Sequence, residues 1–288
     1  MDQKLSAYLI QNQRDEITGY HIYHRLAKRI RDPHNAEILR KIAENEMEHY
    51  QTLKTYTGRD VKPSWFTILL YTFMGRLLGL TFSLKLMERG EDAAQRNYEK
   101  LGQGVSEVQR IIDEEEIHEK ELLGMVNEES LNYIGSVVLG LNDALVELTG
   151  AMAGFTLAIQ KSRTIALMGL ITGIAATFSM AASEFLSQRQ EGNKEEAAKS
   201  SLYTGAAYIG TVVLLVLPYF LIHNPFIALA VMMGIAILII LVFNFYISVA
   251  RDLPFRKRFL EMAFISLGVA ALSFGIGWLV RTFWGLEI

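Results

Sequence analysis

The sequence LNYIGSVVLGLNDALVELTGAMAGFTLAI, residues 131–159, decides the fold class of the C-terminal half of the chain. It is long and apolar enough to cross a hydrocarbon layer of about 30 Å as one helix. Four more apolar stretches follow, at about 164–187, 202–222, 226–249 and 259–283. The sequence therefore predicts a transmembrane domain of five helices and an integral, multi-pass membrane protein.

The charges between these stretches indicate their orientation, because Lys and Arg gather in the cytoplasmic loops of membrane proteins. One side carries seven such residues: Arg189, Lys194, Lys199, Arg251, Arg256, Lys257 and Arg258. The other side carries three: Lys161, Arg163 and Arg281. This bias predicts that the part before the first span is cytoplasmic and that the C-terminus is outside. Since no targeting segment is evident, we expect a prokaryotic plasma membrane.

The composition divides the chain at the same place. Residues 1–128 hold 21 Asp+Glu and 18 Lys+Arg, whereas residues 129–288 hold 10 of each. The chain has no Cys, which excludes disulfide scaffolds, thiolate metal sites and cysteine nucleophiles. Its near-neutral charge balance argues against a nucleic-acid partner. We expect a charged cytoplasmic domain at 1–128 and a membrane domain in the lipid bilayer at 129–288.

Polar side chains interrupt the first two spans. Asp143 and Glu147 are four residues apart and share a helix face, and Met180 and Glu184 have the same spacing in the second span. A carboxylate inside a bilayer costs at least about 2.5 kcal/mol and often marks an ion path. Carboxylate and thioether ligands suit a divalent first-row metal ion. The alternatives are that Glu147 and Glu184 are hydrated near the interface and that Met180 is core packing.

Four segments of the membrane domain resemble the vacuolar iron transporter family: NDALVELTGAMAG (142–154), SMAASEFLS (179–187), LPYFL (217–221) and RKRFLEMAFISLG (256–268). The resemblance implies five spans, a homodimer with a path between protomers, and export of Fe²⁺ or Mn²⁺ from the cytoplasm in exchange for protons. It assigns Asp143, Met180 and Glu184 to the metal path.

Two features depart from that family. Ala144 follows the aspartate where Gly is usual. The Glu-rich helical cap that eukaryotic members carry between the second and third spans is missing, and we expect a short loop with Glu191, Glu195 and Glu196 in its place. Metal is therefore collected by another part of the chain, or not collected at all.

Residues 1–128 contain four stretches with helical periodicity, at about 5–31, 34–57, 65–101 and 104–126. Acidic or His residues interrupt the apolar stripe of each. The second and fourth stretches carry Glu-x-x-His motifs, and the first and third each carry a Glu that is followed by Tyr seven residues later. Polar groups on a core stripe are costly unless they are paired or bound to metal.

This repeat is the ligand pattern of four-helix bundles that hold two metal ions between carboxylates and imidazoles. We expect a di-metal site formed by six residues: Glu16, Glu46, His49, Glu91, Glu115 and His118. Glu88, one turn before Glu91, is an alternative ligand. The other acids near the motifs could build extra weak metal sites, but a solvated acidic face is favoured: Glu44, Glu48, Asp113, Glu114 and Glu119. No haem or nucleotide is expected.

The six-residue set resembles the ferritin-like superfamily, and its Glu-x6-Tyr pairing is most similar to rubrerythrin. The resemblance implies that two Fe²⁺ ions bind and react with O₂ or H₂O₂, and Mn²⁺ fits the same ligands. The fusion to a transporter-like membrane domain resembles the membrane-bound ferritin type of exporter. The chain lacks the Cys₄ rubredoxin module that would supply electrons to a peroxidase cycle.

Residues 65–87 are apolar except at Arg76 and Lys85, and they are long enough for a sixth span. A span here would put a membrane between the helices that share the di-metal site. We therefore expect a cytoplasmic helix, bent near Gly75 or Gly79, that packs on a partner protomer or lies in the membrane interface.

The sequence thus predicts an all-α protein in which a cytoplasmic ferritin-like four-helix bundle precedes a five-helix transmembrane domain. The leading hypothesis is a transporter whose bundle gathers Fe²⁺ or Mn²⁺ for the membrane path. One alternative is a membrane-anchored ferroxidase or peroxide-scavenging enzyme. Another is a bundle that senses metal and gates transport without delivering ions.

Overall fold

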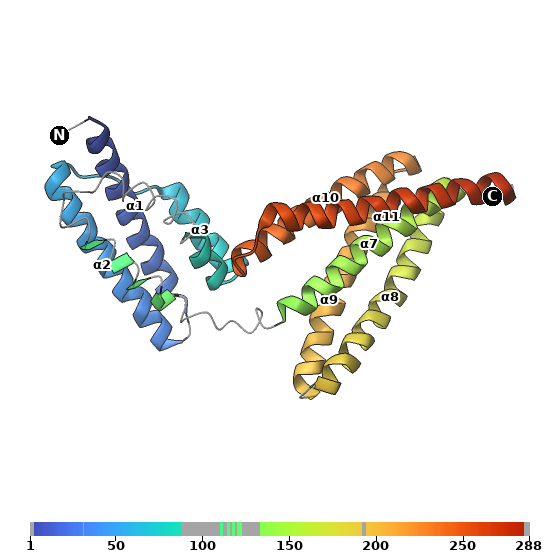
Figure 1. The fold of residues 1–288 in the computed structure, drawn as a ribbon, viewed down its shortest axis with the longest axis horizontal. Helices are drawn as coiled ribbons and strands as arrows, with labels where there is room; N and C mark the ends of the chain where they lie inside the picture. The colour runs from blue at the N-terminus through green and yellow to red at the C-terminus, as the bar shows by residue number, and fades with distance from the viewer. Residues whose placement is uncertain are drawn as a thin grey trace. The chain divides into compact units, whose positions relative to one another are not determined.

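The computed structural model describes residues 3–30, 32–87, 133–191 and 194–284, together with part of a helical segment: Arg110, Ile111, Glu114, Glu115, Ile117, His118, Lys120, Glu121 and Leu122. The chain divides into two compact units, Met1–Glu128 and Glu129–Ile288. The secondary structure of the described residues is helical in both units (Figure 1).

The first unit is built on two helices that pack side by side, α1 (Gln3–Ala27) and α2 (Pro33–Thr57) (Figure 1). Asp32 caps α2, because its side chain accepts hydrogen bonds from the backbone N–H groups of His34 at 2.8 Å and Asn35 at 3.2 Å. α2 ends at Gly58, whose φ of 62° is accessible to glycine at little cost. The first helix ends at Ala27, so its predicted extension to residue 31 is wrong.

The third helix differs from the single helix predicted over 65–101. α3 (Trp65–Leu77) begins at the cap Ser64 and ends before Gly79, which has a φ of 95°. The chain is helical again over residues 80–87, so the bend predicted near Gly79 is a complete break. The remainder of the predicted third helix lies outside the described residues.

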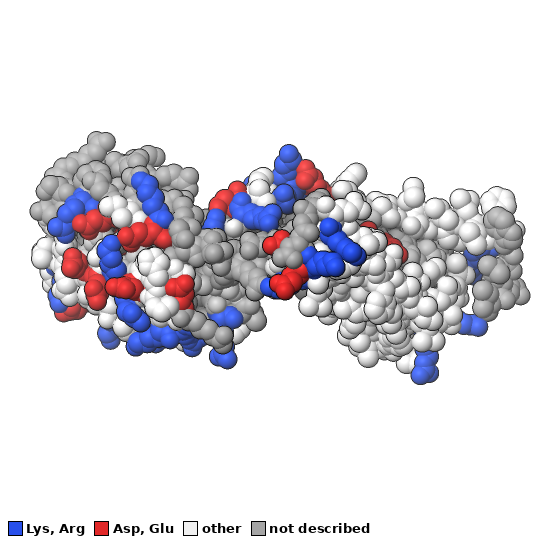
Figure 2. All heavy atoms as spheres, turned by 90° about the horizontal axis from the view of Figure 1, so that it is seen from below, with Lys and Arg blue, Asp and Glu red and all other residues white. Residues whose placement is uncertain are grey.

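The second unit contains five long helices: α7 (Ile134–Ile159), α8 (Ser162–Glu191), α9 (Lys194–Leu221), α10 (Pro225–Ala250) and α11 (Phe255–Trp284). All five are long and apolar enough to cross a membrane, as the sequence predicts. In Figure 2 the surface of this unit is mostly free of charged side chains. The five-span prediction is confirmed, and this part of the chain forms an integral membrane domain.

The short acidic loop predicted between the second and third spans is wrong in extent. Glu191 is the last residue of α8, and Glu195 and Glu196 lie in the first turn of α9. Carboxylates are favourable in a first turn because the helix dipole is positive there. Glu195 and Glu196 therefore favour a start of α9 at Lys194.

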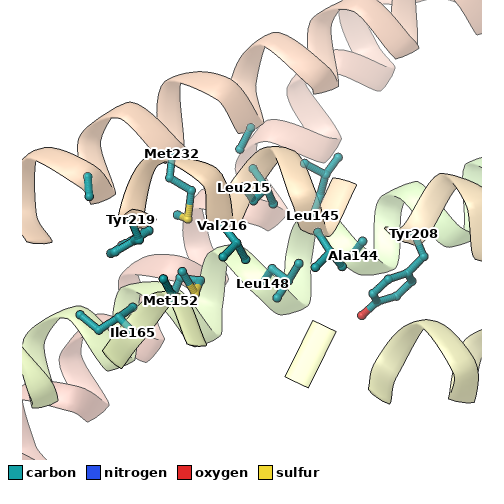
Figure 3. Close-up of a cluster of buried hydrophobic side chains, with 14 of the residues drawn as sticks. Ala144, Leu145, Leu148, Met152, Ile165, Tyr208, Leu215, Val216, Tyr219 and Met232 are labelled. Carbon is teal, nitrogen blue, oxygen red and sulfur yellow. The ribbon is translucent and has the colours of Figure 1, made fainter. Parts of the chain in front are cut away.

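Glycines allow the membrane helices to approach closely. A Cβ at Gly140 would overlap the Thr204 carbonyl oxygen, and a Cβ at Gly277 would overlap that of Gly154. These contacts join α7 to α9 and to α11. An apolar core fills the space beside them, where side chains such as Leu148, Val216 and Met232 meet (Figure 3).

Candidate metal centre

Four ionisable side chains meet in the core of the first unit. α1 provides Glu16, α2 provides Glu46 and His49, and the helical segment around residue 115 provides Glu115. One ligand atom from each lies within 4.8 Å of the others. The exposed fractions of the first three are 6%, 4% and 0%. The structure thus brings together four of the six ligands that the sequence predicts.

The cluster lies between two apolar clusters of the same helices. On one side Ile22, Leu39 and Ile42 belong to the larger apolar cluster. On the other side Leu9 and Leu53 belong to a smaller one. Because the same stripes of α1 and α2 supply apolar and ionisable residues, packing of the helices forces the four ligands into the interior.

His49 is at the centre of the cluster. Its Nδ1 atom lies 3.3 Å from Glu16 Oε2 and 3.2 Å from Glu115 Oε1. Its Nε2 atom lies 2.7 Å from Glu114 Oε2. The ring is therefore oriented from one side by Glu114 and presents Nδ1 to the other two carboxylates.

His118, the fifth predicted ligand, lies beside the four. Its ring centroid is 6.0 Å from that of His49, and its Nδ1 is 3.6 Å from Glu115 Oε2. The two oxygens of Glu115 thus face different imidazoles. Glu91 and its alternative Glu88 lie outside the described residues.

The two His residues are braced in a reciprocal way that the sequence analysis missed. Asn45 and Glu114 each stand immediately before the Glu of a Glu-x-x-His motif, and each contacts the His of the other motif. The Asn45 amide nitrogen lies 2.9 Å from His118 Nε2. In the same way, Glu114 Oε2 lies 2.7 Å from His49 Nε2. Such second partners fix the ring of a metal-binding His. The expectation that Glu114 belongs to a solvated face is wrong.

Buried atoms without partners test whether the cluster fits a metal ion. Glu16 Oε2 and His49 Nδ1 face each other at 3.3 Å as an ion pair, yet neither these atoms nor His118 Nδ1 make a hydrogen bond of good geometry among the described residues. Buried polar atoms are otherwise nearly always hydrogen-bonded. Carboxylate oxygens and imidazole nitrogens are ligands for Fe²⁺ and Mn²⁺, so the donor set fits a divalent metal ion.

Protonation of His49 is favoured when no metal is bound. Burial alone would lower its pKa, but the carboxylates around it raise the pKa to about 11: Glu115, Glu16 and Glu114. The imidazolium offsets part of the negative charge of the cluster. A divalent ion bound at Nδ1 would replace that proton, so metal binding would be coupled to proton release.

Gly19 is a third residue that the sequence analysis missed, after Asn45 and Glu114. A Cβ at this position of α1 would lie 3.0 Å from Glu46 Oε2 and 3.3 Å from Glu46 Cδ. The glycine therefore leaves room for the Glu46 carboxylate between α1 and α2.

We predict that Gly19→Ala weakens metal binding at least tenfold, roughly the effect of losing a supporting residue around a metal site. The new methyl group displaces the Glu46 carboxylate. Because Ala favours a helix over Gly by about 1 kcal/mol, unfolding does not explain the loss. Calorimetric titration of the full chain with Mn²⁺ measures the affinity. Gly234→Ala is the control, since a Cβ there meets nothing within 4 Å; equal affinities for both variants would contradict the role of Gly19.

We predict that Asn45→Leu weakens the binding of one ion by about 10- to 100-fold, because His118 loses the partner of its Nε2 atom. Asn45→Asp should retain binding, since a carboxylate there repeats the contact that Glu114 makes with His49. Calorimetry that resolves the two binding steps measures both variants. The bracing role would be refuted if Asn45→Leu and Asn45→Asp bound metal alike.

The membrane unit holds a separate polar cluster at the end of the bundle where α7 begins. Glu184 of α8 has an exposed fraction of 7%. Its Oε1 atom accepts hydrogen bonds from Ser136 Oγ at 3.0 Å and from Ser200 Oγ. The two hydroxyls lie 2.6 Å apart. Three helices therefore converge on one carboxylate, and its burial argues against the alternative of a hydrated interfacial Glu.

The other predicted path residues lie further along α7 and α8. Tyr208 OH of α9 donates to Glu147 Oε2 at 2.6 Å, although the Glu147 side chain itself is exposed. Asp143 is half-buried, and Met180 is half-buried against the apolar core. Across the described residues 133–191 and 194–284, no three acidic or His side chains of one chain bring ligand atoms within 4.8 Å of one another.

Comparison with known families bears on this part of the chain. Residues 134–201 match the family model described as VIT1, VIT family. The first part of the membrane unit is therefore similar to the VIT family over these residues. The match covers α7, α8 and the start of α9, and it includes all four predicted path residues: Asp143, Glu147, Met180 and Glu184. No curated protein matches the chain. The VIT family domain and the five apolar helices support a vacuolar iron transporter-type membrane domain and a metal ion transporter.

Proposed function

We propose that this protein exports Fe²⁺ or Mn²⁺ from the cytoplasm and that its first unit is a ferritin-like di-metal domain that binds the ions before transport. The observation that carries the proposal is the presence of two separate sets of metal-type ligands in one chain. One is the buried cluster around His49, and the other is the row of carboxylates within the VIT family domain.

The path that we propose contains Asp143, Met180 and Glu184, with Glu147 beside it. The Lys and Arg bias supports an orientation in which the first unit and the Ser136–Glu184 end of the membrane bundle are cytoplasmic, and a prokaryotic plasma membrane is part of the proposal. An ion that leaves the first unit would meet Glu184 first and Asp143 about two turns deeper. Carboxylates that release a metal ion can take up protons, so protons are the proposed counter-ion.

A homodimer is part of the proposal. Glu147 is exposed on the outside of the single chain, yet it lies in the middle of an apolar span. An acidic group facing lipid would be costly. A second copy that covers this face would bring the Glu147 and Asp143 side chains of both protomers to one path.

We predict that Glu184→Gln lowers Mn²⁺ transport at least about tenfold, because the path loses an anionic ligand. The measurement is Mn²⁺ uptake by proteoliposomes whose reconstituted chains have residues 1–128 outside. Glu261→Gln is the control, since Glu261 is an exposed carboxylate of α11. Transport by Glu184→Gln at the Glu261→Gln rate would contradict the path.

The same proteoliposomes distinguish the second candidate function, a membrane-anchored ferroxidase. The buried carboxylates and paired imidazoles of the first unit favour it, because such sites hold two iron ions close together. If the protein is mainly an enzyme, Fe²⁺ addition consumes O₂ and Glu46→Gln abolishes this consumption, while no variant changes Mn²⁺ uptake.

A gating role instead predicts that Glu46→Gln lowers transport at every Mn²⁺ concentration, whereas a delivery role predicts a loss confined to low Mn²⁺.

A further inference from the structure

One face of α3 is apolar and uncovered. We call it the α3 outer face, and its five residues have exposed fractions between 41% and 78%: Trp65, Phe66, Leu69, Leu70 and Phe73. Their spacing of four residues places them along one side of the helix. Contiguous apolar faces of this kind mark interaction sites on otherwise charged domains.

The opposite side of α3 is fixed to the metal-binding unit. Ile68 is fully buried in the same apolar cluster as Ile22 and Leu39. The backbone N–H of Ser64 donates to Thr18 Oγ1 at 3.0 Å, and Thr18 follows the ligand Glu16 by two residues. The α3 outer face is thus held rigidly beside the helix that carries a predicted metal ligand.

Within the stretch 61–87, which contains the α3 outer face, the charges have a single sign, and the acid just before this stretch, Asp60, is ion-paired with Lys54. The sequence from 61 to 87 contains Lys62, Arg76 and Lys85 but no Asp or Glu. Lys62 lies three residues before Trp65, and Arg76 lies three residues after Phe73. Both basic side chains are exposed. At its beginning, the Arg25 guanidinium lies 5.4 Å from the centre of the Trp65 ring.

This combination fits the surface of a bilayer that contains anionic lipids. Tryptophan and basic side chains are favoured at the boundary between head groups and acyl chains, and apolar helix faces insert there. The 13 residues of α3 span about 20 Å, too short for a crossing of about 30 Å. The bilayer is always nearby, because the same chain carries five membrane helices.

A second copy of the chain fits the α3 outer face less well. A two-fold interface joins the same patch on both subunits. Here it would place basic residues of one copy against basic residues of the other, with no acid from the stretch 61–87 to pair with them.

We propose that α3 lies in the plane of the membrane interface, with the α3 outer face toward the acyl chains and Lys62 and Arg76 on anionic head groups. This contact holds the metal-binding unit at the membrane surface. The inference depends on the exposed residues of α3 and on the five spans, and it stands whether or not the protein transports metal.

The test uses the full chain in vesicles of neutral and anionic phospholipids. Since the protein has no Cys, Phe66→Cys carries a single environment-sensitive fluorophore, and Gln51→Cys on the exposed side of α2 is the matched control. We expect quenchers attached to the lipid near the head groups to quench the label at 66 and not the label at 51. Equal quenching at both positions, or none at 66, would overturn the proposal. Energy transfer between labelled copies without lipid quenching would assign the face to a second copy.

Two further variants protect the test against a label that disturbs folding. With Trp278→Phe and Trp284→Phe, Trp65 is the only tryptophan, and its native fluorescence should be quenched by the same lipids. Arg76→Glu should shift the ratio of docked to undocked protein by at least about fivefold in anionic vesicles, the effect of one basic residue near such a surface. Unchanged quenching of Trp65 in Arg76→Glu would contradict the role of the basic residues.

Discussion

The concentration of negative charge around His49 constrains the whole first unit. The ligand atoms of three glutamates and one imidazole lie within 4.8 Å of one another in the core between α1, α2 and the segment around Glu115. Carboxylates this close and this buried are strongly unfavourable unless cations compensate them. The protonated His49 compensates only in part. A divalent ion, or a pair of them, would balance the remainder and would also bind the helices to one another.

The membrane unit solves a similar problem with neutral groups. Glu184 is buried among helices that must also exclude lipid, and two serine hydroxyls donate to one of its oxygens. Tyr208 supports Glu147 in the same way. A hydroxyl donor holds a carboxylate in place without neutralising it, which suits a path through which ions pass and leave.

Much of this arrangement could be predicted from the order of residues. The 3–4 residue spacing of Glu16, Glu46 and His49 on apolar stripes was sufficient to predict that they meet, because helix packing turns periodicity into burial. The five spans followed from length and hydropathy. The predicted division into a soluble and a membrane part rests on the same composition change.

Other features depend on distances that periodicity does not contain. Gly19 matters because α1 and α2 approach closely opposite Glu46, and Asn45 and Glu114 matter because each reaches across to the other motif. The roles of these three residues depend on side-chain rotamers and on the distance between helices. The break before Gly79 depends on the backbone conformation of one residue in a stretch that is otherwise typical of a helix.

The most direct test of the account is the metal content of the purified full chain, measured by elemental analysis and by X-ray absorption at the iron and manganese edges. The account predicts two ions per chain, with oxygen and nitrogen ligands only, and their loss in a Glu46→Gln, Glu115→Gln double variant that remains folded. A wild-type chain that holds no more metal than the double variant would contradict it.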